Sequence, residues 1–339
     1  HGREHSFPTR RSSDLLNGFL NASKSVAIMT HTEPDGDGFC ASLALQRLLI
    51  YQGIDSEIII DADSQLERFK FLMEGAKLSI FESGNYYETL IVLDCNSYTL
   101  LGNRDELLRT ARKRLVIDHH IPTDKELDSD YTFVDIAEVC TGSIIYKMFK
   151  SEINNLPPAE QRFIANNLYI TLINDTNNFT NSNTDAKSLS LAAELVDLGI
   201  VPSDLYKAFF LNNTTSQMKY LGEVLSGMEL YNEGQILFLY SSLDMQKRNH
   251  LSTNAISVPR FVQGIKGVEV IAFLRQDDKE AYNLSLRSDT VDVNAIAVSY
   301  GGGGHRSASG AMLYGELEEL KSDLISKLKQ ALTEFPNNV

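Results

Sequence analysis

The apolar run Leu115-Val116-Ile117 ends directly on Asp118-His119-His120, and this junction constrains the fold more than any other feature of the chain. The run predicts a buried strand that delivers a carboxylate and two imidazoles into a loop. Similar short apolar runs recur from residue 25 onward and alternate with helical segments. Strands are expected at residues 26–29, 57–60, 90–93, 115–117 and 131–134, and helices at 141–149 and 158–172.

This alternation predicts an α/β fold, because βαβ units favour a parallel sheet covered by helices on both faces. We expect an N-terminal doubly wound parallel-sheet domain at residues 16–200 and a smaller C-terminal α/β domain at 231–339, with a cleft between them. A helical connection is expected at 201–230. In the second domain, strands are expected at 235–240, 268–275 and 282–287, followed by helices at 293–300 and 317–328.

Composition limits the functions that the chain can perform. The 339 residues, 43% of them hydrophobic, suffice for two ordinary cores. No apolar run approaches membrane-spanning length, so no membrane partner is expected. The net charge of -14 opposes binding to long duplex nucleic acid, which needs a basic surface, and favours a short or mononucleotide substrate.

Two further features concern the origin and compartment of the chain. Residues 6–15 read SFPTRRSSDL, which resembles the translation of a sequencing-library adapter, so residues 1–15 are expected to be a non-native head. Three cysteines, Cys40, Cys95 and Cys140, form no C-x-x-C pair. They are expected to be buried thiols of a protein in the reducing cytoplasm.

Three further groups of polar side chains, like the Asp-His-His triplet, follow apolar segments. They are His31-Thr-Glu-Pro-Asp35-Gly-Asp37, Leu93-Asp94 and Asn174-Asp175-Thr176. Ligands of parallel sheets gather beyond the carboxyl ends of the strands, so these side chains are expected to meet there. Oxygen and imidazole ligands without thiolate suit Mn²⁺ or Mg²⁺ better than structural zinc, although imidazole alone would also accept zinc or iron. The expected chemistry is two-metal hydrolysis of a phosphate ester.

A simpler interpretation exists for each residue taken alone. Asp35 and Asp37 lie where a helix is expected to begin, and carboxylates commonly cap helices there. Capping does not explain His31. A single histidine is more often an ordinary core or surface residue, but four of the five histidines other than His1 and His5 fall in the motifs.

The glycine run from Gly301 to Gly304 allows two interpretations. Missing side chains let successive backbone N-H groups approach a phosphate, but the same run is also typical of a flexible turn. Arg287-Ser288 precedes the run and His305-Arg306 follows it. These neighbouring donors favour a phosphate-binding turn.

In order and spacing, these motifs resemble the DHH family of phosphoesterases, which is named after the aspartate-histidine-histidine triplet. The glycine run with its histidine resembles the signature of the DHH-associated C-terminal domain. The resemblance implies a metal-dependent phosphoesterase with two Mn²⁺ ions, or with Mg²⁺ or Co²⁺ in their place. It assigns one ion to His31, Asp35 and Asp94, and the other to Asp37, Asp94, His119 and Asp175, with Asp94 bridging the two.

The same resemblance implies roles around the metals. His120 is expected to contact the substrate phosphate as a donor or acid, and Asp118 to orient His119 or the strand end. The second domain is expected to bind the nucleotide through Arg287, Ser288, Gly303, Gly304 and His305. The sequence departs from the family pattern at Cys40, Ala41, Leu100 and Asn177, which puts substrate preference in doubt.

The compact two-domain branch of the family implies a specific activity. It hydrolyses short oligoribonucleotides to mononucleotides and 3'-phosphoadenosine-5'-phosphate to AMP. A phosphodiesterase for cyclic or linear dinucleotides of the c-di-AMP type remains an alternative, as does a non-catalytic nucleotide-binding sensor. The chain is also compatible with assembly into a homodimer.

Overall fold

The computed structural model describes residues 18–19, 23, 25–122, 127–250, 256–304 and 306–334. The head expected at residues 1–15 and the candidate residue His305 lie outside the described residues. The chain divides into two compact units, His1–Asn212 and Asn213–Val339. This division falls within the connection expected at 201–230. Helix α8 (Pro202–Phe210) contacts α6 of unit 1, and α9 (Thr215–Ser226) contacts β8 of unit 2.

Unit 1 contains a six-stranded parallel sheet in the order β3-β2-β1-β4-β5-β6. Its strands are β1 (Ser25–Met29), β2 (Asp55–Ile60), β3 (Leu78–Ile80), β4 (Thr89–Leu93), β5 (Lys113–Asp118) and β6 (Tyr131–Val134). The parallel α/β domain predicted from the sequence is confirmed. Strand β3 was not predicted, because it has only three residues at an edge of the sheet and none of them is fully buried.

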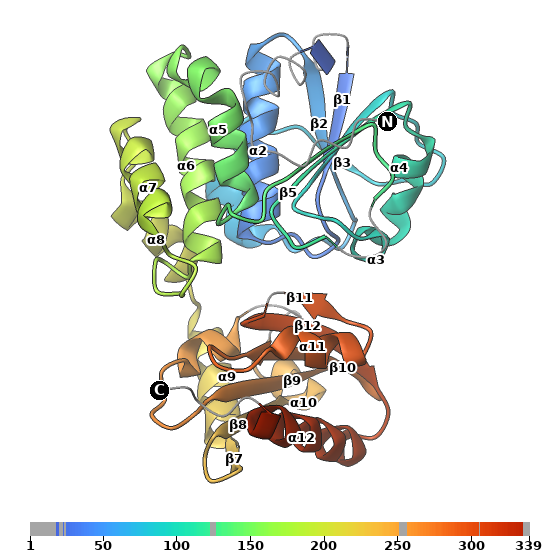
Figure 1. The fold of residues 1–339 in the computed structure, drawn as a ribbon, viewed down its shortest axis with the longest axis vertical. Coiled ribbons are helices and arrows are strands. Elements are labelled where there is room, and N and C mark those ends of the chain that lie inside the picture. The colour runs from blue at the N-terminus through green and yellow to red at the C-terminus, as the bar shows by residue number, and fades with distance from the viewer. Residues whose placement is uncertain are drawn as a thin grey trace. The chain divides into compact units, whose positions relative to one another are not determined.

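Helices cover both faces of this sheet (Figure 1). One face packs against α2 (Gly36–Tyr51), α5 (Thr141–Asn154) and α6 (Pro158–Asp175), and the other against α3 (Tyr98–Leu101) and α4 (Asp105–Thr110). Alternate residues of one strand serve the two cores: Val26 and Ile28 face the first set of helices, and Ala27 and Met29 the second. This explains why the strands read as unbroken apolar runs.

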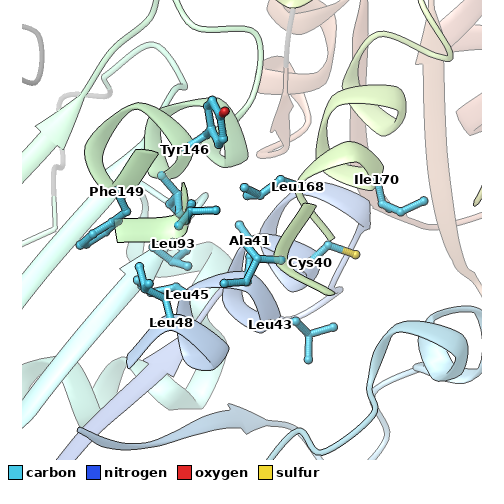
Figure 2. Close-up of a cluster of buried hydrophobic side chains, with 14 of the residues drawn as sticks. Cys40, Ala41, Leu43, Leu45, Leu48, Leu93, Tyr146, Phe149, Leu168 and Ile170 are labelled. Carbon is cyan, nitrogen blue, oxygen red and sulfur yellow. The ribbon is translucent and has the colours of Figure 1, made fainter. Parts of the chain in front are cut away.

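The larger core joins elements that are distant in sequence. Figure 2 shows Cys40 and Leu45 of α2, Leu93 of β4, Phe149 of α5 and Leu168 of α6 in one buried cluster. The thiols of Cys40, Cys95 and Cys140 are free and buried, as expected. Helix α7 (Ala186–Asp197) packs against α6 at the edge of this layer.

Unit 2 contains a mixed sheet in the order β11-β12-β10-β9-β8-β7, in which only β8 and β9 are parallel. Its strands are β7 (Glu229–Tyr231), β8 (Ile236–Ser241), β9 (Val270–Asp278), β10 (Ala281–Arg287), β11 (Gly303–Gly304) and β12 (Ala308–Tyr314). One face packs against α11 (Val293–Ser299) and α12 (Leu317–Glu334), and the other against α9. The short helix α10 (Leu243–Arg248) contacts α9 and β9.

In the described part of the chain, no helix is both long enough and apolar enough to cross a bilayer.

Candidate metal centre

Three of the four predicted clusters lie at the carboxyl ends of adjacent strands. His31 follows β1, Asp94 follows β4, and Asp118 is the last residue of β5. Strands β1, β4 and β5 are neighbours in the sheet, and all point the same way. The parallel topology therefore brings residues from distant parts of the sequence to one edge, where they form a polar site.

The first cluster connects β1 to α2. Asp35 is the N-cap of α2, and its Oδ1 accepts hydrogen bonds from the backbone N-H groups of Asp37 at 2.9 Å and Gly38 at 3.0 Å. Helix capping, the simpler interpretation of this carboxylate, is therefore correct for Asp35. The same carboxylate also lies 3.6 Å from Nε2 of His31, so it is part of the polar site as well.

Asp37 does not cap its own helix. Its carboxylate accepts hydrogen bonds from the backbone N-H groups of Thr141 at 2.6 Å and Gly142 at 3.1 Å, at the N-terminus of α5. This positive helix end favours an anion. The side chain of Asp37 is 1% exposed, and its Oδ2 lies 3.5 Å from Nε2 of His119. The sequence did not reveal the contact between Asp37 and the N-terminus of α5, because Asp37 and Thr141 are far apart along the chain.

Asp94 occupies the middle of the site. Its backbone φ of 55° lies in the left-handed region, which is rare for a non-glycine residue and marks a position held by its surroundings. Its Oδ2 lies 3.8 Å from Nε2 of His31, and its Oδ1 lies 3.6 Å from Nε2 of His119. Thr141 donates its hydroxyl to the same Oδ1 at 3.1 Å. Asp94 therefore contacts both expected groups of ligands, as a bridging residue must.

The two adjacent histidines have different surroundings. The His119 side chain is 6% exposed, with Nε2 3.2 Å from Oδ2 of Asp175 and Nδ1 3.3 Å from the backbone carbonyl of Glu138. That carbonyl fixes the ring so that Nε2 faces the carboxylates. His120 is 28% exposed.

Asp118 contacts the ring of His120 and not that of His119. Its Oδ1 lies 2.7 Å from Nδ1 of His120 and also accepts the backbone N-H groups of both histidines. Of the two roles expected for Asp118, ordering the strand end fits the structure and orienting the His119 ring does not. The sequence could not separate them, because the directions of adjacent side chains in a loop depend on its backbone.

Asp175 reaches the site from a helix. The sequence placed it in a loop after a helix ending at residue 172, but α6 continues through Asp175. Asn174 lies beside it and donates its amide to Asp175 Oδ1 at 2.9 Å and to Asp35 Oδ2 at 3.3 Å. Asn174 thus links the fourth cluster to the first, a role that sequence reasoning missed.

Glycines give the clusters room to approach each other. A Cβ atom on Gly36 would lie 2.6 Å from the Asn174 side chain, and one on Gly38 would lie 2.0 Å from Oγ1 of Thr30. A side chain at either position would push α2 away from β1 or α6. The two glycines of the Asp35-Gly-Asp-Gly38 sequence were a signal for this close approach.

Among the residues that the structure describes, the potential ligand atoms fall into three groups whose members lie within 4.8 Å of one another. These groups are His31 with Asp35 and Asp94, Asp37 with His119 and Asp175, and Asp94 with His119 and His120. The first two contain every residue that the family resemblance assigns to the metals. The third shows that His120 also lies close enough to serve as a ligand.

The electrostatics of the site fit divalent cations. Burial and the charge of Asp35 raise the pKa of Asp94 to about 6. Burial and the charges of Asp94 and Asp175 raise the pKa of Asp37 well above its ordinary value. Burial lowers the pKa of His119, but hydrogen bonding and charge from Asp175 overcome this effect and raise it to about 10. Crowded carboxylates retain protons unless cations neutralise them, and oxygen and imidazole donors suit Mn²⁺ or Mg²⁺.

The candidate nucleotide-binding residues of unit 2 have different roles in the structure. Arg287 ends β10, is partly buried, and donates from Nη1 to its neighbouring carbonyl at Leu286. Ser288 is buried; its hydroxyl donates to the Glu269 carbonyl and accepts the N-H of Val291. The hydroxyl of Ser288 therefore orders the turn after β10, and its contact with substrate stays a prediction.

The glycine run is divided between two functions. The N-H groups of Gly301 and Gly302 bond to the carbonyls of Val298 and Ala297 and so close the end of α11. Gly303 and Gly304 are exposed and form the edge strand β11. The idea of successive amides converging on one phosphate is thus wrong for the first two glycines, whose donors cap a helix. For Gly303 and Gly304 in the edge strand, phosphate binding by the backbone amides stays a prediction.

The departures from the family pattern also find places in the structure. Cys40 and Ala41 are completely buried in α2, so they bear on core packing. Asn177 has a φ of 46°, a conformation that glycine and asparagine adopt most easily, so asparagine can replace glycine there. Leu100 is 49% exposed, and its carbonyl accepts the N-H of Thr32 in the first-cluster loop.

Comparisons with known proteins agree with this geometry. Residues 25–172 match the N-terminal domain of the DHH family, and residues 238–334 match the DHHA1 domain. The bifunctional oligoribonuclease and PAP phosphatase NrnA of Mycoplasma genitalium is 27% identical over 91% of this chain and 96% of its own length. The protein of the same name from Bacillus subtilis is 23% identical over 90% of this chain and 95% of its own length.

A solved structure shares the fold. An exopolyphosphatase-related protein from Bacteroides fragilis matches with a TM-score of 0.83 and 21% identity, over 96% of this chain and 98% of that one. The two domain matches, their order and the arrangement of the Asp-His-His triplet lead to one conclusion. The chain belongs to the DHH family of phosphoesterases, with a DHH domain followed by a DHHA1 domain.

Proposed function

We propose that this phosphoesterase hydrolyses short oligoribonucleotides to mononucleotides and 3'-phosphoadenosine-5'-phosphate to AMP, with two Mn²⁺ ions or with Mg²⁺ or Co²⁺ in their place. The observation that carries the proposal is the pair of ligand groups around Asp94. Relatives whose printed name is bifunctional oligoribonuclease and PAP phosphatase match nearly the full length of the chain, which supports these substrates over others.

In this proposal, the chain's own groups divide the work. Asp35 and His31 would hold one ion, Asp37, Asp175 and His119 would hold the other, and Asp94 would be a ligand of both. When bound, two such ions polarise the phosphate and lower the pKa of a coordinated water. The backbone amides at the N-terminus of α5 fix the Asp37 carboxylate, so this ligand needs no reorganisation when the metal binds.

His120 is assigned to the substrate. Its ring is held by Asp118, and its exposure leaves it within reach of a phosphate arriving from solvent. In this role, the imidazole donates a hydrogen bond to a phosphate oxygen or a proton to the leaving group. In unit 2, we assign nucleotide binding to Arg287 and to the exposed edge at Gly303 and Gly304. His305, which lies outside the described residues, is assigned there from the family resemblance alone.

The test is a panel of substrates assayed with Mn²⁺: a dinucleotide, a pentanucleotide, 3'-phosphoadenosine-5'-phosphate and c-di-AMP. Turnover of the oligonucleotides and the bisphosphate is expected to exceed that of c-di-AMP. Preference for c-di-AMP would favour the dinucleotide phosphodiesterase instead. Absence of turnover on every member, with nucleotide binding retained, would favour the sensor.

A variant of the bridging residue tests the metal assignment within the same experiment. Asp94→Ala is expected to abolish Mn²⁺-dependent turnover and to lower the number of bound ions, because each of the two proposed ions would lose the ligand that they share. Circular dichroism should show that the fold is retained. Near-normal activity in this variant would contradict the proposed centre.

A further inference from the structure

Arg68, which lies outside every motif found in the sequence, is an exposed residue beside the candidate metal centre. It belongs to the short 3-10 helix η1 (Glu67–Leu72), in the connection between β2 and β3. Its Nη2 donates to the carbonyl of Pro34 at 3.2 Å, and Pro34 directly precedes the N-cap Asp35. The guanidinium therefore lies at the loop that carries the first metal ligands.

The rings of Phe69 and Phe209 pack against the guanidinium of Arg68 and hold it in position. The adjacent residue Phe69 is completely buried, with its ring centroid 4.9 Å from that of Phe39 in α2 and 6.0 Å from that of Phe209 in α8. The Cζ atom of Arg68 lies 4.6 Å from the Phe69 centroid and 5.5 Å from the Phe209 centroid. Cation-π contacts of this kind orient a guanidinium without neutralising its charge.

Arg68 differs from most arginines of unit 1 in having no carboxylate within ion-pair distance among the described residues. The arginines that do form ion pairs are Arg47, Arg104, Arg109, Arg112 and Arg114. The charge of Arg68 nevertheless influences the ionisation of Asp35. Burial opposes ionisation of Asp35, but His31, the Gly38 amide and the charge of Arg68 together lower its pKa.

Charge balance indicates what such a cation would bind. The four carboxylates Asp35, Asp37, Asp94 and Asp175 would cancel the charge of two bound divalent ions. The negative charge of a nucleotide substrate would then need a further cation, most of all where the nucleotide carries a second phosphate. A guanidinium has five N-H donors in a fixed fork, and one donor group of Arg68 is used on Pro34, so others are available for phosphate oxygens.

We propose that Arg68 is a substrate-positioning residue that binds phosphate oxygens of the nucleotide at the metal centre and favours substrates with a second phosphate. This inference rests on the proposed function and deepens it, because it assigns the preference for a nucleoside bisphosphate to a residue outside the metal ligands. Arg68 acts by holding the substrate; it neither binds a metal nor transfers a proton.

The experiment compares Arg68→Met and Arg68→Lys with wild type in the Mn²⁺-loaded full chain. Arg112→Met is the matched control. Arg112 is 75% exposed and directly precedes β5, so it lies at the amino-terminal end of the strand, whereas the metal centre lies at the carboxyl end. The substrates are 3'-phosphoadenosine-5'-phosphate, with two phosphates, and bis-p-nitrophenyl phosphate, with one. Equilibrium binding of the bisphosphate is measured by calorimetry, which does not require turnover.

Arg68→Met is expected to raise KM and the dissociation constant for the bisphosphate roughly ten- to hundredfold, as expected for loss of a charge-assisted contact. Bound Mn²⁺ should stay at the wild-type level, the single-phosphate ester should change by less than about threefold, and Arg68→Lys should recover part of the affinity. Arg112→Met should match wild type in every measurement.

Other results separate the two proposals. Unchanged bisphosphate binding in Arg68→Met, equal losses on both substrates, or loss of Mn²⁺ would overturn the role of Arg68 while leaving the proposed function intact. A wild-type protein that binds the bisphosphate without hydrolysing it would overturn the proposed function. The binding comparison between wild type and Arg68→Met would still decide the role of Arg68.

Discussion

At the scale of single residues, the centre shows how adjacent and chemically identical side chains acquire different environments. His119 is nearly buried among carboxylates, and the backbone carbonyl of Glu138 holds its ring. His120 is more exposed and is held by Asp118. The two rings differ in the group that contacts Nδ1. This group is a neutral backbone carbonyl for His119 and a carboxylate for His120.

This difference predicts separate effects of substitution. His119→Ala is expected to lower the number of bound Mn²⁺ ions, since three carboxylates lie within 3.6 Å of its Nε2. His120→Ala is expected to retain the metals and to lose about two to four decades in kcat, the usual range for a general acid. Metal content and single-turnover rates measure the two effects, with the exposed His250→Ala as the control. Equal metal loss in both variants would mean that His120 is a ligand.

At the scale of elements, the close approach of α5 and α6 determines where the centre forms. Gly142 lies at the contact, and a Cβ atom there would lie 2.0 Å from Oγ1 and 2.7 Å from Cβ of Thr171. The N-H of Gly142 is also a donor to Asp37. One glycine therefore lets two helices pack and places a positive helix end against Asp37, a proposed metal ligand.

Gly142→Ala is expected to destabilise the protein by about 1–3 kcal/mol, because the added methyl forces the helices apart. The same displacement should weaken Mn²⁺ binding by moving the amides away from Asp37. Gly222→Ala is the matched control: this glycine is also helical, but its Cβ would meet nothing within 4 Å, and the change should stabilise by roughly 0.5–1 kcal/mol. Denaturant unfolding and metal titration provide the measurements. Unchanged metal affinity in Gly142→Ala would show that the helix end is dispensable.

At the scale of the whole molecule, the two units have separate cores and, in the proposed function, separate tasks. Unit 1 contains all the described groups of potential metal ligands. Unit 2 contains Arg287 and the exposed glycines of β11. Binding energy from parts of a substrate that do not react can position the bond that does, so a nucleotide-binding unit would serve catalysis without touching the metals.

Arg287→Ala is therefore expected to weaken cleavage of a dinucleotide by about one to two decades in kcat/KM, the effect of losing roughly 1.5–3 kcal/mol from a charge-assisted contact. Bound Mn²⁺ should not change, and hydrolysis of bis-p-nitrophenyl phosphate should change much less. Asp94→Ala should show the reverse, with metal lost and nucleotide binding retained. If Arg287→Ala lowers both activities equally in a folded protein, nucleotide binding does not depend on this residue.

The sequence by itself determined five of the six strands described in unit 1, the presence of α5 and α6, and the residue types of the candidate metal centre. Short apolar runs specify buried strands locally, and the polar residues that end them are adjacent in the chain, so both are visible without tertiary structure. The same local signals gave β8, β9 and β10 of unit 2. They missed β7, which has three residues, and β11, which consists of two glycines. They also missed β12, whose small residues Ala308, Ser309, Gly310 and Ala311 form no apolar run.

Only the tertiary structure decided how the candidate residues are used. Asp37 meets the N-terminus of α5, His119 meets the Glu138 carbonyl, and Arg68 reaches the Pro34 loop, in each case through contacts between distant parts of the chain. The residue type of Ser288 does not show whether its hydroxyl orders a turn or binds substrate, because a hydroxyl can hydrogen-bond to the backbone or to a phosphate. Local sequence specifies which groups are present, whereas packing of helices against a common sheet specifies which of them meet.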